Sequence, residues 1–266
     1  MRVVISAGGT GGHIYPALAI INKIKEMEPN SEFLYIGTTN RMEKDLIPSM
    51  GYRYEGIEVT GFKRKLTLDN FKTITNFLNA IKRCKIIIKD FDPDIVIGCG
   101  GYVTAPVIYA AKKLGKKTFI HEQNSVVGLA NKFLARYTDK IGVSFESTIK
   151  DFPKGKAILT GNPCSEKALN IKKTTKEKLD IAKDKKLVLI VMGSLGSKTI
   201  NDKIFSFIDK FRSKNYSVII VTGNSYYERV KDKRVPSNVK VLPFIYEMPS
   251  VMKITDLMVT RAGAST

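Results

Sequence analysis

The sequence predicts an α/β protein built from two doubly wound, mostly parallel sheets. Short apolar runs alternate with amphipathic segments along most of the chain. Parallel neighbours need long crossovers, and helices are the compact way to make them. The alternation breaks once, in a polar, lysine-rich stretch between Gly161 and Lys186. Because 266 residues suffice for about two domains, we expect one domain over residues 1–161 and a second over residues 162–266.

Each element of the first domain follows from its periodicity. Runs rich in Val, Ile, Phe and Tyr predict strands, and apolar residues that recur every three or four positions predict helices. The expected strands are residues 2–6, 33–37, 54–59, 95–98, 118–121, 141–145 and 157–160. The expected helices are residues 14–28, 41–50, 69–89, 103–114 and 129–136.

The second domain repeats the alternation. Residues 187–192 are the strongest buried-strand signal in the chain, and further strands are expected at 217–222, 239–243 and 256–260. Helices are expected at 199–212, 225–231 and 246–254. A glycine turn and a Ser-Thr helix cap come last, and they predict a helix that does not follow. We therefore expect the second domain to be truncated.

The composition indicates a folded protein with anionic partners. Hydrophobic residues make up 43% and charged residues 26%, which is typical of soluble globular proteins. The formal net charge of +19 favours phosphates, nucleic acids or anionic lipid surfaces. The basic clusters carry no RNA-binding signature and no interleaved aromatic residues. A lysine-rich surface is therefore expected, with no nucleic acid as a partner.

The cysteines and the N-terminus predict a reducing compartment and no metal site. Cys84, Cys99 and Cys164 are odd in number and lack CxxC spacing, so neither a disulfide framework nor a zinc site is expected. The first strand begins at once, without the basic and apolar regions of a secretory signal. No apolar run approaches the length that spans a bilayer.

A glycine-rich turn, AGGTGGH, joins the first strand to the first helix. Such a turn lets backbone N–H groups approach an anion, and the helix N-terminus adds a favourable dipole. The dinucleotide fingerprint fails because Ile14 occupies its third glycine position, and no acid closes the second strand. A nicotinamide cofactor is therefore disfavoured, while a tight turn without a ligand remains the alternative.

Three further motifs favour a ligand. GCGGY over residues 98–102 and HEQN over residues 121–124 also follow strands. Because strand carboxyl ends of an open parallel sheet converge on one crevice, these motifs and residues 8–13 are expected to share an edge. In the second domain, MGSLGS over residues 192–197 offers N–H groups and two hydroxyls, which suit a diphosphate.

Six segments together resemble the MurG family, the bacterial UDP-N-acetylglucosamine:lipid I N-acetylglucosaminyltransferases of peptidoglycan synthesis. They are AGGTGGHIYPALAI, GTTNRMEKDLIP, PDIVIGCGGYVTAP, HEQNSVVGLANKFLA, TGNP and DLMVTRAGAST. The resemblance implies the GT-B fold, with an acceptor lobe, a donor-nucleotide lobe and a cleft between them. It implies inverting transfer of N-acetylglucosamine from UDP to the C4 hydroxyl of the muramyl sugar, with UDP-N-acetylglucosamine as co-substrate and no further cofactor.

A direct displacement needs a base for the acceptor hydroxyl. We nominate His13, because histidine titrates near neutral pH. Two alternatives stay open: His13 caps the helix or binds acceptor without moving a proton, or Glu122 is the base.

The resemblance also assigns binding residues. It places the donor sugar and phosphates near Thr10, Gly11 and Gly12, and the sugar hydroxyls near Asn124. It assigns the diphosphate to Ser194, the uracil edge to Ile245, and ribose and phosphate to Ala264, Ser265 and Thr266. The acceptor or phosphate loop is Gly100, Gly101 and Tyr102. Relatives commonly carry an arginine after TGNP, whereas this chain has Ser165, which we expect to donate one hydrogen bond near the diphosphate. Relatives also commonly carry a glutamine within the second glycine motif, where this chain has Leu195.

One helix carries a candidate membrane patch of apolar and basic side chains at helical spacing. Its members are Phe71, Ile74, Leu78, Ile81, Lys82 and Arg83. An amphipathic basic helix is drawn to anionic lipid, and a lipid-linked acceptor needs access to the membrane. We therefore expect peripheral association with the cytoplasmic face of the bacterial membrane. The alternative is an ordinary helix that covers the sheet.

Two other functions would explain part of this pattern. A UDP-sugar 2-epimerase of similar fold would use glycine loops and UDP without an acceptor, but GGTGGH and HEQN argue against it. A non-catalytic nucleotide-binding membrane adaptor would explain the loops and the charge. It would leave His13, Glu122 and Asn124 without a role.

Overall fold

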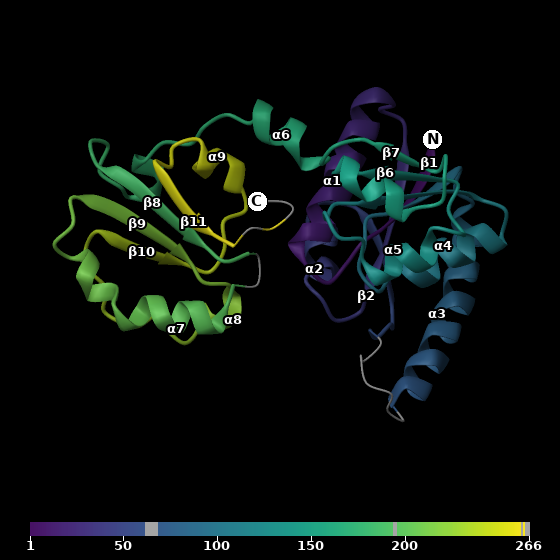
Figure 1. The fold of residues 1–266 in the computed structure, drawn as a ribbon, viewed down its shortest axis with the longest axis horizontal. Coiled ribbons are helices and arrows are strands. Elements are labelled where there is room, and N and C mark those ends of the chain that lie inside the picture. Colours follow the sequence, from purple (N-terminus) through teal and green to yellow (C-terminus); the bar gives the residue numbers. More distant parts are fainter. Residues whose placement is uncertain (62–68, 194–195, 262, 264–266) are drawn as a thin grey trace. The chain divides into compact units, whose positions relative to one another are not determined.

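The computed structural model describes residues 1–61, 69–193, 196–261 and 263, with the side chains of residues 69–72 and 167 outside the description. The chain divides into two compact units, Met1–Ser165 and Glu166–Ala264. Each unit contains an open, fully parallel sheet with helices between its strands (Figure 1). The predicted α/β class is confirmed.

The first sheet has the strand order β3-β2-β1-β4-β5-β6-β7. Its strands are β1 (Arg2–Ser6), β2 (Glu32–Thr38), β3 (Arg53–Ile57), β4 (Ile95–Gly98), β5 (Lys117–Glu122), β6 (Lys140–Val143) and β7 (Ala157–Leu159). The helices are α1 (Gly11–Met27), α2 (Glu43–Ser49), α3 (Asp69–Phe91), α4 (Thr104–Lys113), α5 (Leu129–Leu134) and the 3-10 helix η1 (Glu146–Asp151). The order reverses between β1 and β4, which makes that junction the natural ligand-binding edge.

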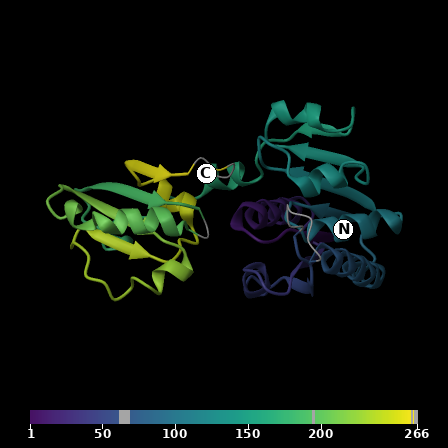
Figure 2. The same ribbon diagram turned by 60° about the horizontal axis from the view of Figure 1, so that its bottom comes forward.

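Helices lie on both faces of this sheet (Figure 2), and each face has its own hydrophobic core. On one face, α1 and α2 pack on β1 and β2 through a cluster that includes Ile5, Ile14 and Ile47. On the other face, α3, α4 and α5 pack through a cluster that includes Val4, Ile88 and Leu134. Because right-handed crossovers that run in opposite directions place their helices on opposite faces, the reversal at β1 and β4 accounts for both layers.

The second sheet has the order β10-β9-β8-β11. Its strands are β8 (Lys186–Val191), β9 (Tyr216–Val221), β10 (Val239–Leu242) and β11 (Leu257–Thr260). The unit also contains α7 (Lys198–Ser206), η3 (Ile208–Phe211), α8 (Asn224–Tyr227) and α9 (Met248–Met252). Two short elements lie between β7 and β8 along the chain, α6 (Cys164–Asn170) and η2 (Glu177–Leu179). The strand order of the second sheet reverses between β8 and β11, which again marks a ligand-binding edge.

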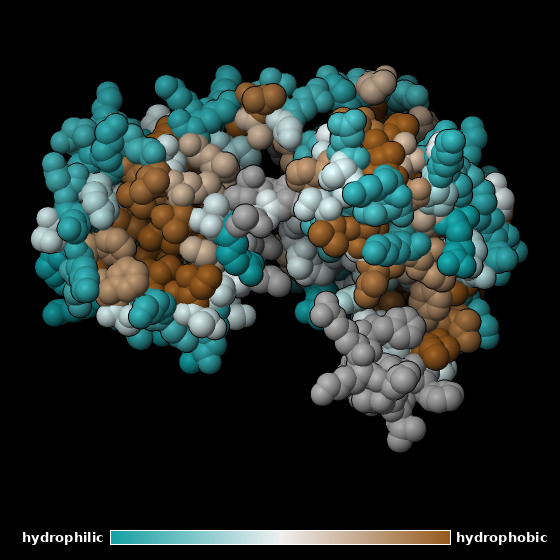
Figure 3. Space-filling view, viewed as in Figure 1, coloured by the Kyte–Doolittle hydropathy of each residue, from teal (hydrophilic) through white to brown (hydrophobic). Residues whose placement is uncertain are grey.

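An apolar groove of about 660 Å³ lies between α7 and the strands β8 and β11. It is lined by Val188, Ile190 and Leu257 among others, and apolar side chains gather on this part of the unit (Figure 3). Leu257 is 57% exposed. Parallel sheets are normally covered on both faces, so this face is less covered than usual in the described chain.

Candidate active site

The loops after β1 and β4 are bound to each other at the point where the strand order reverses. The Gly8 amide donates to the Gly100 carbonyl at 3.2 Å, and the Cys99 amide donates to the Ser6 carbonyl at 2.9 Å. The buried Thr104 hydroxyl also donates to the Gly100 carbonyl, at 2.8 Å. The structure therefore brings the first two glycine motifs together at one edge of the sheet.

The His13 ring lies between these loops. Its Nδ1 is 3.0 Å from the Gly8 carbonyl oxygen. Because a carbonyl oxygen only accepts, Nδ1 carries the proton and Nε2 presents a lone pair in the neutral ring. An imidazole held in this tautomer can accept a proton at Nε2, as a general base does.

Gly100 and Gly101 give the ring and its loop the room that they need. Both residues have positive φ, +100° and +89°, where other residues are strained. A Cβ on Gly100 would lie 2.6 Å from the His13 Cδ2 atom, and a Cβ on Gly101 would lie 2.4 Å from the Gly8 carbonyl oxygen. Only glycine fits at these two positions, which explains the motif at the end of β4.

Glu122, at the end of β5, is buried and fully hydrogen-bonded. One carboxylate oxygen accepts from the backbone and side-chain nitrogens of Asn124, at 3.0 and 2.8 Å. The other accepts from the Gly128 amide and the Asn131 side chain, both at 2.9 Å. These donors make Glu122 an anchor for the following loop, and this geometry favours His13 over Glu122 as the base.

The neighbours of Glu122 divide into buried and exposed residues. Gln123 is buried and donates to the Cys99 carbonyl at 3.0 Å, which ties the end of β5 to the end of β4. Asn124 is exposed, and its side-chain NH₂ group is oriented by Glu122. Its side-chain oxygen is therefore presented at the surface. Tyr102 is also exposed, and its ring covers Gly61.

The other histidine, His121, is buried and held by hydrogen bonds to the segment after β7. Its Nε2 lies 3.0 Å from the Gly161 carbonyl oxygen and 3.1 Å from the Thr160 hydroxyl. Burial lowers the pKa of the His121 ring, against a smaller opposing effect of the Gly161 hydrogen bond. The ring is neutral and links β5 to the segment after β7.

In the second unit, the glycine loop after β8 leads into α7. Gly196 N–H donates to the Gly193 carbonyl at 3.1 Å, and a Cβ on Gly196 would overlap the Thr222 carbonyl. The first turn of α7 contains no acidic residue. The guanidinium of Arg261 lies beside Gly193, where a Cβ would be 2.9 Å from its Nη2. The sequence analysis assigned no role to Arg261, although it follows β11, the strand that pairs with β8.

The remaining predicted residues lie apart or outside the description. Ile245 is partly buried against the core of the second unit. Ser165 is exposed in α6. Ser194, Leu195, Ala264, Ser265 and Thr266 lie outside the described residues, so their predicted contacts stay predictions.

Comparison with known proteins identifies the family. The description "Glycosyltransferase family 28 N-terminal domain" matches residues 3–143, and "Glycosyltransferase family 28 C-terminal domain" matches residues 187–266. A relative from Bacillus cereus is 49% identical over the whole chain, which covers 74% of that relative. It is named UDP-N-acetylglucosamine--N-acetylmuramyl-(pentapeptide) pyrophosphoryl-undecaprenol N-acetylglucosamine transferase 1. This chain belongs to the MurG family of glycosyltransferase family 28.

Solved structures agree with this assignment. MurG from Acinetobacter baumannii is 28% identical, with a TM-score of 0.65 over 99% of this chain and 74% of its own. A UDP-GlcNAc 2-epimerase from Neisseria meningitidis gives the same TM-score over 99% of this chain and 78% of its own, at 16% identity. That second likeness shows the fold alone. The predicted family and the GT-B fold class are confirmed.

The helix that was expected to bind membranes needs one correction. Ile81 is only 8% exposed and packs in the core beneath α3, so its place in the membrane patch was wrong. The helical period turns residues 81, 84 and 88 toward the sheet, whereas Ile74 and Leu78 face outward, 46% and 53% exposed. Lys82 is exposed, and Arg83 pairs with Glu55 at 3.2 Å. The side chain of Phe71 lies outside the description.

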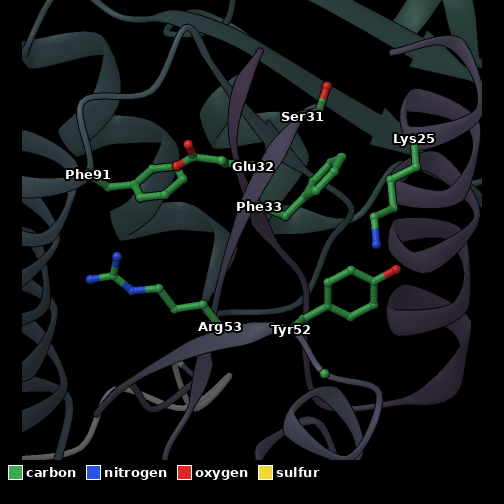
Figure 4. Close-up of a pocket in the computed structure, with 8 residues that line it drawn as sticks. Lys25, Ser31, Glu32, Phe33, Tyr52, Arg53 and Phe91 are labelled. Carbon is green, nitrogen blue, oxygen red and sulfur yellow. The ribbon is translucent and has the colours of Figure 1, made fainter. Parts of the chain in front are cut away.

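The described residues lack two other kinds of site. No three His, Cys, Asp or Glu side chains among them gather closely enough to hold a metal ion. No helix in the described ranges is long and apolar enough to cross a bilayer. A hollow of about 300 Å³ lies at the N-terminal ends of β2 and β3, which are the ends opposite the candidate site (Figure 4). It is lined by Lys25, Tyr52 and Arg53 among others. It contains no residue of the predicted site.

Proposed function

We propose that this chain transfers N-acetylglucosamine from UDP-N-acetylglucosamine to the C4 hydroxyl of the muramyl sugar of lipid I, which gives lipid II. Membership of the MurG family supports the reaction and both substrates. The observation that carries the mechanism is the His13 ring, whose Nδ1 is fixed by the Gly8 carbonyl so that Nε2 is free to accept a proton.

The proposed reaction is one displacement with inversion. The acceptor oxygen attacks the anomeric carbon while its proton passes to Nε2 of His13. The bond between the anomeric carbon and the diphosphate oxygen breaks, and its electron pair leaves with UDP. General-base catalysis of this kind contributes about 10²–10⁴-fold to the rate.

The leaving diphosphate needs stabilisation as its charge develops. The N-terminus of α7 supplies N–H groups and a dipole, and its first turn contains no acidic residue. Arg261 beside Gly193 adds a cation. We assign Ser194 to the same diphosphate and Asn124 to the sugar hydroxyls. We propose no bound cofactor, because UDP already activates the sugar.

Membrane association is part of the proposal. Ile74 and Leu78 are exposed on α3 beside Lys82, which is the combination that docks on anionic lipid. We propose peripheral binding at the cytoplasmic face, where a lipid-linked acceptor and a soluble nucleotide sugar would meet.

Incubation with UDP-N-acetylglucosamine and a lipid I analogue tests the proposal. We expect a disaccharide-lipid product with a β linkage and one UDP per product. An epimerised sugar formed without acceptor would instead indicate the 2-epimerase reaction. Nucleotide binding without turnover, in an assay where the Bacillus cereus relative turns over, would contradict catalysis by this chain.

A further inference from the structure

A buried carboxylate, Glu43 at the start of α2, lies beneath the first glycine loop. Its side chain is completely inaccessible to solvent. Two glycines leave the space that it fills: a Cβ on Gly8 would lie 2.4 Å from its Oε1, and a Cβ on Gly37 would lie 2.8 Å from its Cγ. Neither the family resemblance nor the proposed reaction gives this residue a role.

All the hydrogen-bond partners described for Glu43 are donors. Oε1 accepts from the Thr38 amide at 3.2 Å and from the Thr38 hydroxyl at 2.6 Å. Oε2 accepts from the Gly9 amide at 3.2 Å. Among the described ion pairs, none includes Glu43. Buried carboxylates are expensive unless hydrogen-bonded, so these three donors account for its presence.

The contact with Gly9 connects Glu43 to the candidate base. The Gly9 N–H and the Gly8 C=O belong to one trans peptide group, and they point in opposite directions. On one side the N–H donates to Glu43, and on the other side the C=O accepts from His13 Nδ1 at 3.0 Å. The carboxylate and the imidazole are thus joined through a single peptide.

We propose that Glu43 is a positioning residue for His13 and acts through the Gly8–Gly9 peptide. A negative charge on the N–H side polarises the peptide and makes the Gly8 oxygen a better acceptor. That strengthens the Nδ1–H tautomer, which keeps Nε2 unprotonated toward the acceptor. A carboxylate bonded directly to a catalytic imidazole does the same. The catalytic part of this inference rests on the proposed function, but the tautomer part does not.

The substitution Glu43→Gln tests the inference. Three donors face two oxygens, so the amide oxygen of glutamine will turn to the two Thr38 donors and its NH₂ group to Gly9. The Gly9 N–H then loses its acceptor. Thr38→Val is the matched control within the network, because it removes one donor and leaves the carboxylate on Gly9. Asp45→Asn is the control for charge, since Asp45 is exposed on the same helix.

The readout is the tautomer of each imidazole, measured by two-bond ¹H–¹⁵N correlation NMR. The chain has only two histidines, so the spectrum contains two ring systems. We expect the Nδ1–H to Nε2–H ratio of His13 to fall about fivefold in Glu43→Gln, because the Gly9 N–H loses its charged acceptor and the Gly8 oxygen becomes a weaker acceptor for Nδ1–H. His121 and both controls should keep their ratios. An unchanged His13 ratio in a folded Glu43→Gln chain would overturn the inference.

Two further measurements keep the inference separate from its assumptions. If Glu43→Gln does not fold, the wild-type chain decides: an Nε2–H His13 ring, or a Gly9 amide that exchanges freely with solvent, would overturn the inference. With lipid I, kcat should fall about tenfold while KM for UDP-N-acetylglucosamine stays within about twofold, because the base loses orientation and the donor contacts remain. If turnover is independent of His13, the proposed base is wrong, and the tautomer result still stands.

Discussion

At the scale of single residues, Gly100 leaves the space that the His13 ring occupies, since a Cβ there would lie 2.6 Å from the His13 Cδ2 atom. Gly100→Ala should reduce turnover by about tenfold or more, because the new methyl group would displace the His13 ring that accepts the proton of the acceptor hydroxyl. Gly115→Ala is the matched control, since Gly115 also has positive φ, +71°, but nothing lies within 4 Å of its Cβ position. It should cost only about 1 kcal/mol of stability and leave kcat unchanged. Steady-state kinetics and thermal unfolding separate the two effects.

Equal losses of kcat in both glycine variants would show that strain, rather than the contact with His13, decides the outcome.

His121 predicts a pH dependence of stability. Burial lowers the pKa of its ring in the folded chain, whereas the unfolded ring titrates near its ordinary value of about 6.5. The unfolded state therefore binds a proton first, and the free energy of unfolding should fall as pH drops below about 6.5. His121→Gln keeps a donor for Gly161 but cannot titrate. Denaturant unfolding from pH 7 to pH 5 should show a flatter profile for this variant, and parallel profiles would contradict the assignment.

At the scale of elements, one lysine closes the end of α5. The Lys156 ammonium donates to the carbonyls of Ala135, Arg136 and Thr138, at 3.1, 3.3 and 2.8 Å. Lys156→Met should lower the free energy of unfolding by about 1–3 kcal/mol, because it leaves these carbonyls without a cationic donor. Lys154→Met, at an exposed position in the same loop, should change it by less than about 0.5 kcal/mol.

Urea unfolding of both lysine variants measures the difference. If Lys154→Met were as destabilising as Lys156→Met, the loss would come from charge and not from the carbonyl contacts.

Most elements could be predicted because their periodicity is strong. Every expected strand is present, and ends differ by one or two residues, as at β5 and β6. The expected helix over 199–212 was wrong in part: α7 ends at Ser206 and a 3-10 turn follows. Helix α6 was not predicted, since the polar stretch around it lacks an apolar face. Asn162 marks the start of α6, however, because asparagine is a preferred N-cap residue and its side chain accepts a hydrogen bond from the Cys164 amide.

The candidate site could be predicted in part for a related reason. The carboxyl ends of parallel strands share one edge of the sheet, so the convergence of Gly8 and Gly100 could be deduced from motifs that follow two strands. The role of Glu43 could not, because its partners Thr38 and Gly9 lie on two separate segments that only the folded chain brings together around it. Ile81 was misplaced because a helix with polar residues on several faces does not reveal which stripe is buried.

At the scale of the whole molecule, charge and apolar exposure predict lipid binding. The net charge of +19 attracts the chain to anionic vesicles, and the exposed side chains of α3 would then insert. Ile74→Ser combined with Leu78→Ser should weaken binding to phosphatidylglycerol vesicles about tenfold, given the transfer energy of two side chains. Leu169→Ser, at a 77% exposed position in α6, should have little effect.

Vesicle sedimentation at two salt concentrations measures this binding. Salt-sensitive binding that is equal in the double variant and in wild type would contradict docking through α3.

The most direct test of the account is the effect of His13→Ala on turnover and on donor affinity, measured together with UDP-N-acetylglucosamine and a lipid I analogue. The account predicts that kcat falls by about 10²–10⁴-fold, as expected when a general base is removed. The Kd for UDP-N-acetylglucosamine should stay within about twofold. Unchanged turnover, or an equal loss of turnover and donor affinity, would contradict proton transfer by His13.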